Sequence, residues 1–512
     1  MKRINGLIYL LVIIKFLLPL FLADPFYQPH RDEYLYLAEG HHLAWGFMEV
    51  PPMMSVLAAI SNFMGAGMFW IKFWPALAGS LTFLLVAKMA RSLGGGSFAI
   101  ILAFLPFLFT GYIRLFYFFH PNFLDAFFWT LIAFSLLRYL QSQNNKWLYL
   151  FGLATGLGMM SKYSVAFYAC SILLAILFSR QRKLFLNKHL YFSILLAFLI
   201  FLPNLLWQYQ HRFPVLKHMA ELQREQLQFI DPVKFLISQL VMFLPCIFIW
   251  IFGLYYAGIS RQGRNLRPFA LAYIIVIALL LLLHGKDYYT VGAYPVLFAI
   301  GAGYLEKLTA GNHRFWRLIM VLVPVGLGIL IFPILMPIAK PGTLARFYES
   351  GKIEKSGALR WEDQKNHALP QDFADMIEWR ETAEKAALVF KSLTLPDQAR
   401  TLVYCRGYYF AGALNYYGPN VGLPEVYSDN ASFLFWMPKQ YNIRNLILVA
   451  HQIPRNDDMV FQQFERMTVM DSISNPLARE NGIKIILYQN GNEKVNEMIA
   501  QSIMEQKSKF TR

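Results

Sequence analysis

Long apolar runs separated by short polar loops dominate the first two thirds of the chain. A helix needs roughly 17–25 apolar residues to cross a bilayer core about 30 Å thick, because inside lipid its backbone N–H and C=O groups must bond within the segment. The runs that approach this length lie near residues 5–23, 69–90, 97–118, 122–140, 147–161, 163–179, 190–207, 233–259, 268–284, 288–305 and 316–338. The pattern predicts a polytopic α-helical membrane protein with about eleven transmembrane helices.

The pattern changes after Lys340, where polar and apolar residues mix as in a soluble domain. One stretch of helical periodicity and three β-rich runs follow, at 371–393, 401–405, 445–450 and 483–488. Short strands alternating with helical segments are typical of a small α/β domain. We therefore expect a membrane domain over residues 1–340 and a soluble α/β domain over 341–512. The second domain has no Gly-rich phosphate loop and no Cys/His metal spacing, so we interpret it as a lid or docking domain.

The composition excludes a soluble protein and a nucleic-acid-binding protein. Of the 512 residues, 56% are hydrophobic and 15% are charged, whereas a soluble domain carries about 25% charged residues. The net charge of +16 arises within residues 1–340, which hold 27 Lys and Arg against 11 Asp and Glu. Because these bases are scattered between apolar runs, they do not form the continuous stripe that nucleic acids require.

Membrane topology explains the bases better. If the N-terminus is cytoplasmic, sixteen of the 27 bases of residues 1–340 fall in cytoplasmic loops, as the positive-inside rule expects. With eleven spans, the domain 341–512 lies outside the cytoplasm. We expect a multi-pass protein of the cell inner (cytoplasmic) membrane. Glu306 shares the cytoplasmic side, and the other ten acids of residues 1–340 lie at the outer surface.

Two outer loops contain amphipathic stretches that are too polar to cross the bilayer. Residues 34–45 combine apolar Leu35 and Leu37 with polar Glu39, and residues 208–232 show a similar pattern. Helices of this kind lie in the headgroup plane. We expect interfacial helices in both outer loops, roofing a cavity at the outer surface.

Four acids and a histidine of the outer loops are candidates for chemistry. Asp32 and Glu33 are adjacent in an aromatic, apolar segment, Glu49 follows in the same loop, and the segment HPNFLD runs from His120 to Asp125. Each carboxylate could simply complement the start of a helix. However, ionised groups in apolar surroundings need partners or a water-filled cavity. We assign Asp32, Glu33 and Asp125 as catalytic candidates, with Glu49 and His120 as substrate-binding candidates.

Cations lie in the same outer loops, on the side that topology depletes of positive charge. They are Lys162 in a short turn, Arg212 after the run 190–207, and Lys286 in the segment HGKDYYT with Tyr288 and Tyr289. Snorkelling lysines and interfacial tyrosines explain each residue taken alone. Together they could donate hydrogen bonds to the phosphate of a lipid-linked substrate, while a carboxylate accepts a proton from the acceptor.

Six segments of the membrane part carry a family resemblance. They read RDEYLYLAEG, GFMEVPPMMSVLAAI, HPNFLDAFFWTL, GLATGLGMMSKYS, LPNLLWQYQHRFPVLKH and HGKDYYTVGAYPVLFAIGAG. In these segments the chain resembles glycosyltransferase family 39 of the GT-C type, which contains protein O-mannosyltransferases and the lipid A aminoarabinose transferase. The tail segments YYFAGALNYYGPNVGLPEVYSDNASFLFW and SNPLARENG resemble bacterial members of unassigned acceptor.

The resemblance implies a GT-C fold, a polyprenyl-phosphate-linked sugar donor and inversion at the anomeric carbon. The loop acid of the family falls on Asp32, with Glu33 beside it, and the second outer-loop acid falls on Asp125. The Glu before the double proline falls on Glu49. The aminoarabinose transferase has a lysine just before that double proline, where this chain has Val50. We expect Lys162 and the group of Lys286, Tyr288 and Tyr289 to replace that phosphate contact.

The sequence therefore predicts an inverting glycosyltransferase at the outer face of the membrane. Its partners would be the polyprenyl-phosphate sugar, membrane lipids, and a glycan, lipid or protein acceptor. This chemistry requires no cofactor, and no ligand spacing indicates a metal, although Mg²⁺ or Mn²⁺ could bridge the loop carboxylates and the phosphate. Two alternatives are a polyprenyl-linked glycan flippase or ligase and a secondary transporter. A transporter would carry its ionisable residues near the bilayer midplane.

Overall fold

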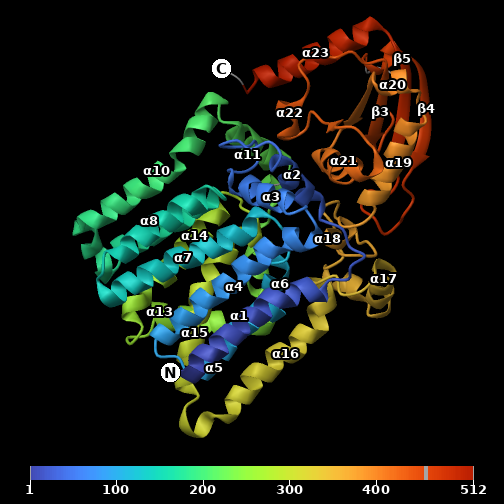
Figure 1. The fold of residues 1–512 in the computed structure, drawn as a ribbon. Helices are drawn as coiled ribbons and strands as arrows, with labels where there is room; N and C mark the ends of the chain where they lie inside the picture. Colours follow the sequence, from blue (N-terminus) through green and yellow to red (C-terminus); the bar gives the residue numbers. More distant parts are fainter. Residues whose placement is uncertain (1, 226, 455–458, 511–512) are drawn as a thin grey trace.

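The computed structural model describes residues 2–225, 227–454 and 459–510. Figure 1 shows a bundle of helices with the N-terminus at one end and the C-terminal part of the chain at the other. Six helices of the described residues are long and apolar enough to cross a membrane: α1 (Lys2–Leu22), α4 (Met68–Ser92), α7 (Pro121–Ser142), α10 (Lys188–Gln210), α14 (Arg267–Leu282, with the 3₁₀ turn before it) and α16 (Phe315–Leu335).

The other predicted runs are also helical, but they are bent or short. The bent pairs are α9 (Ser164–Leu177) with η1 (Arg180–Leu186), at 109°, and α12 (Pro232–Val241) with α13 (Ile247–Gly258), at 64°; the short helices are α5 (Ser97–Phe109), α8 (Lys146–Met159) and α15 (Tyr294–Leu308). If each bent pair counts as one span, the described residues hold up to eight spans rather than eleven. The 14 residues of α8 rise only about 21 Å, which is shorter than a bilayer core.

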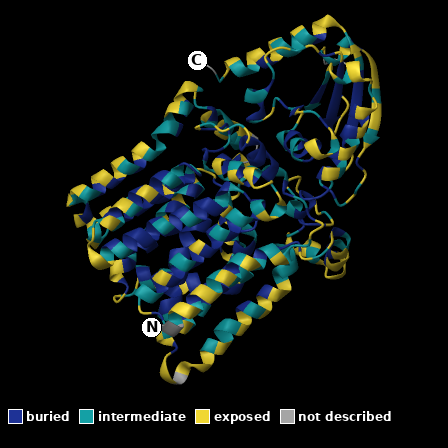
Figure 2. Cartoon of the chain, viewed as in Figure 1, coloured by how far each residue is buried: buried dark blue, intermediate teal, exposed yellow. Residues whose placement is uncertain are grey.

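The outer helices of the bundle expose apolar side chains. Figure 2 shows exposed positions along α10 and α16, whereas α7 is largely buried. On α16 the exposed side chains include Phe315, at 68%, and Leu330, at 71%. A surface of this kind is stable in lipid but not in water, in agreement with a multi-pass membrane protein.

Short helices cover the end of the bundle that faces the C-terminal part. They are α2 (Arg31–Glu39), α3 (Met53–Phe63), α6 (Tyr112–Leu115), α11 (Pro214–Glu225) and η5 (Asp287–Ala293). The second predicted interfacial helix corresponds to α11, which exposes Leu216 and Met219. The first predicted interfacial helix corresponds to α2, but its expected position in the headgroup plane is wrong. Residues 33–39 of α2 are buried between α3 and the C-terminal part.

The C-terminal part contains a mixed five-stranded sheet in the order β2-β1-β3-β5-β4. Its strands are β1 (Thr401–Cys405), β2 (Val426–Tyr427), β3 (Asn445–Ala450), β4 (Phe464–Ser472) and β5 (Lys484–Gly491). The strand β1 pairs in parallel with β2 and β3, whereas β5 is antiparallel to β3 and β4. The three predicted strands are β1, β3 and β5, so the α/β class is confirmed.

Helices of the C-terminal part connect the sheet to the bundle. They are α17 (Pro341–Ser350), α18 (Gln371–Ala374), α19 (Trp379–Lys391), α20 (Leu395–Gln398), α21 (Tyr408–Val421), α22 (Phe433–Trp436) and α23 (Glu493–Ser508). Helix α21 packs directly on α2, where a Cβ at Gly412 would lie 2.9 Å from the backbone of Tyr34. One cluster of buried apolar side chains continues from the bundle through α2 into α19 and α21.

The carboxylate of Glu33 anchors α2 to the bundle. It is fully buried and lies 2.6 Å from the Lys72 ammonium of α4. It also accepts a hydrogen bond from the backbone N–H of Phe119, before α7, and one from the N–H of His30, which completes the capping box of α2. Burial raises the pKa of Glu33, but the Lys72 charge and the hydrogen bonds outweigh it and lower that pKa. The carboxylate thus joins α2, α4 and the segment before α7.

This arrangement predicts a specific pattern of stability. Lys72→Met should lower the free energy of unfolding by about 3–5 kcal/mol, because it leaves the Glu33 charge buried without its partner. The double variant Glu33→Gln/Lys72→Met should recover most of that loss. Unfolding of the purified protein in detergent measures both effects, with Lys234→Met, at an exposed position, as the control. Equal unfolding of Lys72→Met and the control would contradict the anchoring role.

Candidate active site

The loop before α2 places Asp32 at the junction of the bundle and the C-terminal part. His30 caps α2: its Nδ1 accepts a hydrogen bond from the N–H of Asp32, at 3.3 Å. The Asp32 carboxylate keeps 36% of its side-chain surface exposed. Its Oδ1 accepts a hydrogen bond of 2.7 Å from the hydroxyl of Tyr408, the first residue of α21. Asp32 is thus accessible and held from two sides, unlike its buried neighbour Glu33.

Arg31 ties the same corner to the C-terminal part. Its guanidinium lies over the ring of Tyr409, at 4.1 Å, and within 3.9 Å of carboxylate oxygens of Asp375 and Glu480. It also lies 3.8 Å from Oδ1 of Asp32. The C-terminal part therefore contributes polar side chains that contact this corner of the bundle, as a lid or docking domain can do.

The charges around Asp32 keep it ionised. Burial raises the pKa of Asp32, but Arg31, the protonated forms that His30 and His120 take in acid, and the Tyr408 hydrogen bond outweigh it and lower that pKa to about 2. Burial lowers the pKa of His120 to about 4, with a further contribution from His30. At neutral pH the site therefore combines a carboxylate with a neutral His120 imidazole.

Asp125 and Lys162 form a second pair beside the first. Asp125 lies on the first turns of α7, where its Oδ1 accepts a hydrogen bond of 2.8 Å from Ser164. Lys162, in the turn between α8 and α9, donates to Asn122 at 2.6 Å and lies 3.8 Å from Oδ2 of Asp125. The Lys162 ammonium also lies 4.4 Å from the centre of the Tyr289 ring. The pair has 1% and 19% of its side-chain surface exposed, so Lys162 is the accessible member.

The segment before α7 and the segment η5 link Asp32 to the cations. The ring of His120 has a nitrogen within 4.8 Å of a carboxylate oxygen of Asp32, and Asn122, two residues further on, accepts the hydrogen bond of Lys162. The ring of Tyr289 lies 4.4 Å from the Lys162 ammonium and 5.0 Å from the ring of Tyr288, and the Lys286 ammonium lies 6.0 Å from the Tyr288 ring. Burial lowers the pKa of Lys162; Asp125 counteracts this effect, and the charge of Lys286 adds to it.

Two other predicted residues lie in different surroundings. The carboxylate of Glu49 accepts hydrogen bonds from the backbone N–H and the hydroxyl of Ser432, at 2.8 and 2.6 Å. Burial raises the pKa of Glu39 well above its ordinary value, and the nearby charge of Glu49 raises it further. Arg212 is exposed in the turn before α11, with a positive φ of 58°, and its charge acts on Lys217. Within the described part of the chain, Arg212 shares no hydrogen bond or ion pair with Asp32 or Lys162.

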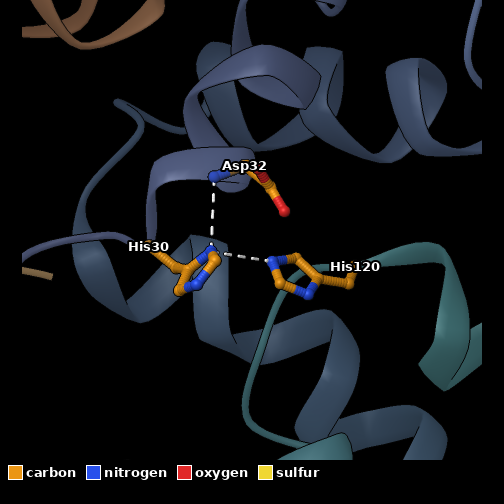
Figure 3. Close-up of side chains that lie close together, drawn as sticks. All are labelled: His30, Asp32 and His120. Carbon is orange, nitrogen blue, oxygen red and sulfur yellow. Dashed lines mark hydrogen bonds between the residues drawn. The ribbon is translucent and has the colours of Figure 1, made fainter. Parts of the chain in front are cut away.

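One group of side chains has the composition of a metal site. His30, Asp32 and His120 each direct one ligand atom into a space where all three atoms lie within 4.8 Å of one another. Figure 3 shows the two imidazoles facing each other, with the Asp32 carboxylate directed to the same side. No spacing in the sequence marks this group, because His120 is 90 residues from His30.

The sequence analysis did not identify three residues of the C-terminal part that contact the site. Tyr408 donates a hydrogen bond to Asp32, and Ser432 donates one to Glu49. Asp375 lies within ion-pair distance of His30 and Arg31. They lie in three separate segments of the tail. The aromatic segment YYFAGALNYYG, which begins at Tyr408, is the one signal that could have pointed to them.

Comparisons with known proteins agree with this architecture. The family described as dolichyl-phosphate-mannose-protein mannosyltransferase matches residues 49–207, which include Glu49, Asp125 and Lys162. No curated protein matches the chain in sequence.

Two solved proteins share the fold at low sequence identity. ArnT from Cupriavidus metallidurans bound to undecaprenyl phosphate has a TM-score of 0.60 and 14% identity, covering 94% of this chain and 97% of that chain; its apo state gives 0.59, 14%, 94% and 98%. The oligosaccharyltransferase from Archaeoglobus fulgidus, in a complex with Zn and sulfate, has a TM-score of 0.52 and 12% identity, covering 86% of this chain and 68% of that chain.

The predicted resemblance is therefore confirmed: the chain has the GT-C fold of ArnT and of oligosaccharyltransferase, and residues 49–207 carry the sequence pattern of the protein mannosyltransferase family.

Proposed function

We propose that this protein is an inverting glycosyltransferase that transfers a sugar from a polyprenyl-phosphate donor to an acceptor at the outer face of the cytoplasmic membrane. The observation that carries the proposal is the accessible carboxylate of Asp32 beside His120, with Lys162 bonded to Asn122 two residues further on. Tyr289, Tyr288 and Lys286 follow next to Lys162. The fold shared with ArnT, which was solved with undecaprenyl phosphate, supports the donor class. The matching family, named for a dolichyl-phosphate-mannose donor, supports it independently.

The reaction is a direct displacement at the anomeric carbon. An acceptor hydroxyl or amine attacks C1 from the face opposite the phosphate, and its proton passes to Asp32. The bond between C1 and the phosphate oxygen breaks, and its electron pair stays on the polyprenyl phosphate, so the configuration at C1 inverts. Because the pKa of Asp32 is about 2, proton transfer comes late, after the attacking atom has become acidic.

The cations act on the leaving phosphate. Lys162 and Lys286 are within reach of each other's charge, and the tyrosine hydroxyls of η5 add hydrogen-bond donors. Each well-placed contact stabilises the developing charge by about 2–4 kcal/mol. We assign Glu33 a supporting role, because its carboxylate is buried and paired with Lys72. Asp125 orients Lys162 in this scheme.

A flippase or ligase and a secondary transporter are the alternatives. The acids of a transporter lie near the middle of its spans, whereas Asp32 and Glu49 lie beside the C-terminal part. A flippase moves the intact lipid and releases no free polyprenyl phosphate. Incubation of the purified protein with a panel of polyprenyl-phosphate sugars, followed by mass spectrometry of the released lipid phosphate, separates these functions.

Asp32→Asn should slow sugar transfer by about 10²–10⁴-fold, because the amide cannot accept the proton. Donor binding and the melting temperature should stay unchanged, since the amide keeps the shape of the side chain and an oxygen acceptor for Tyr408. Release of lipid phosphate over time measures the rate. Asp24→Asn, in the loop before α2, is the control. Normal turnover by Asp32→Asn would remove Asp32 from the mechanism.

Lys162→Ala should weaken binding of the donor at least as strongly as it slows the chemical step, because it removes a phosphate contact. Equilibrium binding of a polyprenyl-phosphate sugar to the protein in nanodiscs measures the effect. The matched control is Lys234→Ala, at an exposed position of α12. A donor affinity equal to that of the control would argue against a phosphate role for Lys162.

Tyr408→Phe should lower kcat by about 10–100-fold, because hydrogen bonds to charged groups contribute roughly 1.5–3 kcal/mol. Tyr408 is a positioning residue for Asp32, so KM for the donor should change little. Steady-state kinetics separate the two parameters. The control Tyr427→Phe removes a hydroxyl that bonds Glu425 on the sheet. A rise in KM at constant kcat would show that Tyr408 binds the donor instead.

A further inference from the structure

We propose that the cavity between the end of α3 and the helices α19 and α21 binds the phosphate headgroup of an anionic membrane phospholipid. The cavity has a volume of about 260 Å³, and its lining includes Asn62, Arg380 and Tyr417. The proposal is separate from the proposed function, because phospholipid binding can be measured without any sugar donor or acceptor.

The cavity lies where the bundle meets the C-terminal part (Figure 1). Gly65 and Ala66, which line it, belong to the loop between α3 and the membrane-spanning helix α4. Arg380 belongs to α19, and Tyr417 belongs to α21. Because α4 leaves the bilayer at this loop, the cavity lies at the level of the lipid headgroups.

The lining of the cavity carries positive charge and contains no Asp or Glu among the described residues. The charge belongs to Arg380, which is exposed, with its guanidinium 5.5 Å from the centre of the Tyr417 ring. Within the described ranges of the chain, no ion pair joins Arg380 to a carboxylate. A guanidinium in this state is a bidentate donor that matches the oxygens of a phosphate.

Neutral donors line the same space. The hydroxyl of Tyr417 accepts a hydrogen bond from Tyr34, at 3.3 Å, so its own proton points elsewhere and can be donated to a ligand. One amide N–H of Asn62 bonds the carbonyl of Leu37, at 3.0 Å, and the amide has a second N–H to donate. Asn420, which is exposed, adds another amide to the lining. The cavity thus offers several donors around one positive charge.

An exposed apolar stripe on α3 leads to the cavity. Val56, Ile60 and Phe63 recur at helical spacing on one face, with 44%, 42% and 88% of their surface exposed, whereas Met54 and Ala58 on the other face are fully buried. The stripe is about 10 Å long, from the rise of 1.5 Å per residue. An apolar stripe of this kind is stable against acyl chains and not in water.

The combination of stripe and cavity selects a phospholipid. A free phosphate ion would use the cavity alone and leave the stripe without a partner. An anionic phospholipid places its acyl chains along α3 and its phosphate beside Arg380. The sugar donor has its own cations, Lys162 and Lys286, on other elements of the bundle. The phospholipid is therefore a second lipid, which joins α3 of the bundle to α19 and α21 of the C-terminal part.

Native mass spectrometry of the full-length protein tests the site. The delipidated protein in detergent is titrated with phosphatidylglycerol or with phosphatidylcholine of the same acyl chains. We expect one phosphatidylglycerol to be retained at least 10-fold more tightly than phosphatidylcholine, and excess inorganic phosphate to leave it bound. Equal affinity for the two lipids would overturn the proposal. Displacement by inorganic phosphate would also overturn it, since the cavity would then be a site for the free ion.

Variants locate the lipid. Arg380→Met should weaken retention of phosphatidylglycerol by about 10–100-fold, because it removes a charged hydrogen bond. Asn420→Asp, which places a negative charge in the cavity, should weaken it as well. The matched control is Arg466→Met, at an exposed position of β4. Melting temperatures verify folding.

Two outcomes of the variant series would contradict the assignment. Equal retention by Arg380→Met and Arg466→Met would show that the lipid lies outside the cavity. A loss in Lys162→Ala as large as that in Arg380→Met would show that phosphatidylglycerol occupies the donor site instead. We expect Lys162→Ala to retain phosphatidylglycerol as the unchanged protein does.

Discussion

One buried carboxylate fixes the helix that carries Asp32. Glu33 accepts hydrogen bonds from Lys72 of α4, from the backbone of Phe119 and from the backbone of His30. A buried charge is costly unless it is paired and fully hydrogen-bonded, so these contacts fix the first turn of α2 against two helices of the bundle. Asp32 precedes Glu33 by one residue and therefore points to another side of α2, towards Tyr408. The same anchor holds Phe119 and, next to it, His120.

The C-terminal part completes the site from the other side. It packs α21 closely on α2, and its residues Tyr408, Asp375 and Ser432 bond polar groups of the loops that precede and follow α2. A carboxylate that is held from both sides keeps one orientation, which favours proton transfer at a fixed place. This packing also explains why α2 is buried although its sequence pattern is amphipathic. The surface expected to face the membrane boundary is covered by protein.

The sequence was sufficient for the fold class, whereas the roles of the site residues stay predictions. Loops that connect adjacent apolar runs must meet at one end of a bundle, so Asp32, Asp125 and Lys162 could be placed near one another from the pattern alone. Lys72 could not be recognised as the partner of Glu33, because it lies within an apolar run. Asp375 gave no local signal, and the aromatic segment at Tyr408 did not show its contact with Asp32, since both roles depend on how α21 and α18 dock. The number of spans could not be fixed from the pattern, because helix bends and short helices leave the hydropathy of a run unchanged: the described residues hold six helices long enough to cross a membrane, or up to eight if each bent pair is one span.

The central claim is that a polyprenyl phosphate and a reactive carbon meet between Asp32 and the cations Lys162 and Lys286. A structure of the protein in nanodiscs with a non-hydrolysable polyprenyl-phosphate sugar tests it most directly. The account predicts the phosphate oxygens in contact with at least one of the two ammonium groups, and C1 of the sugar open to attack from the side of Asp32. A phosphate bound elsewhere, with Asp32 remote from C1, would contradict it.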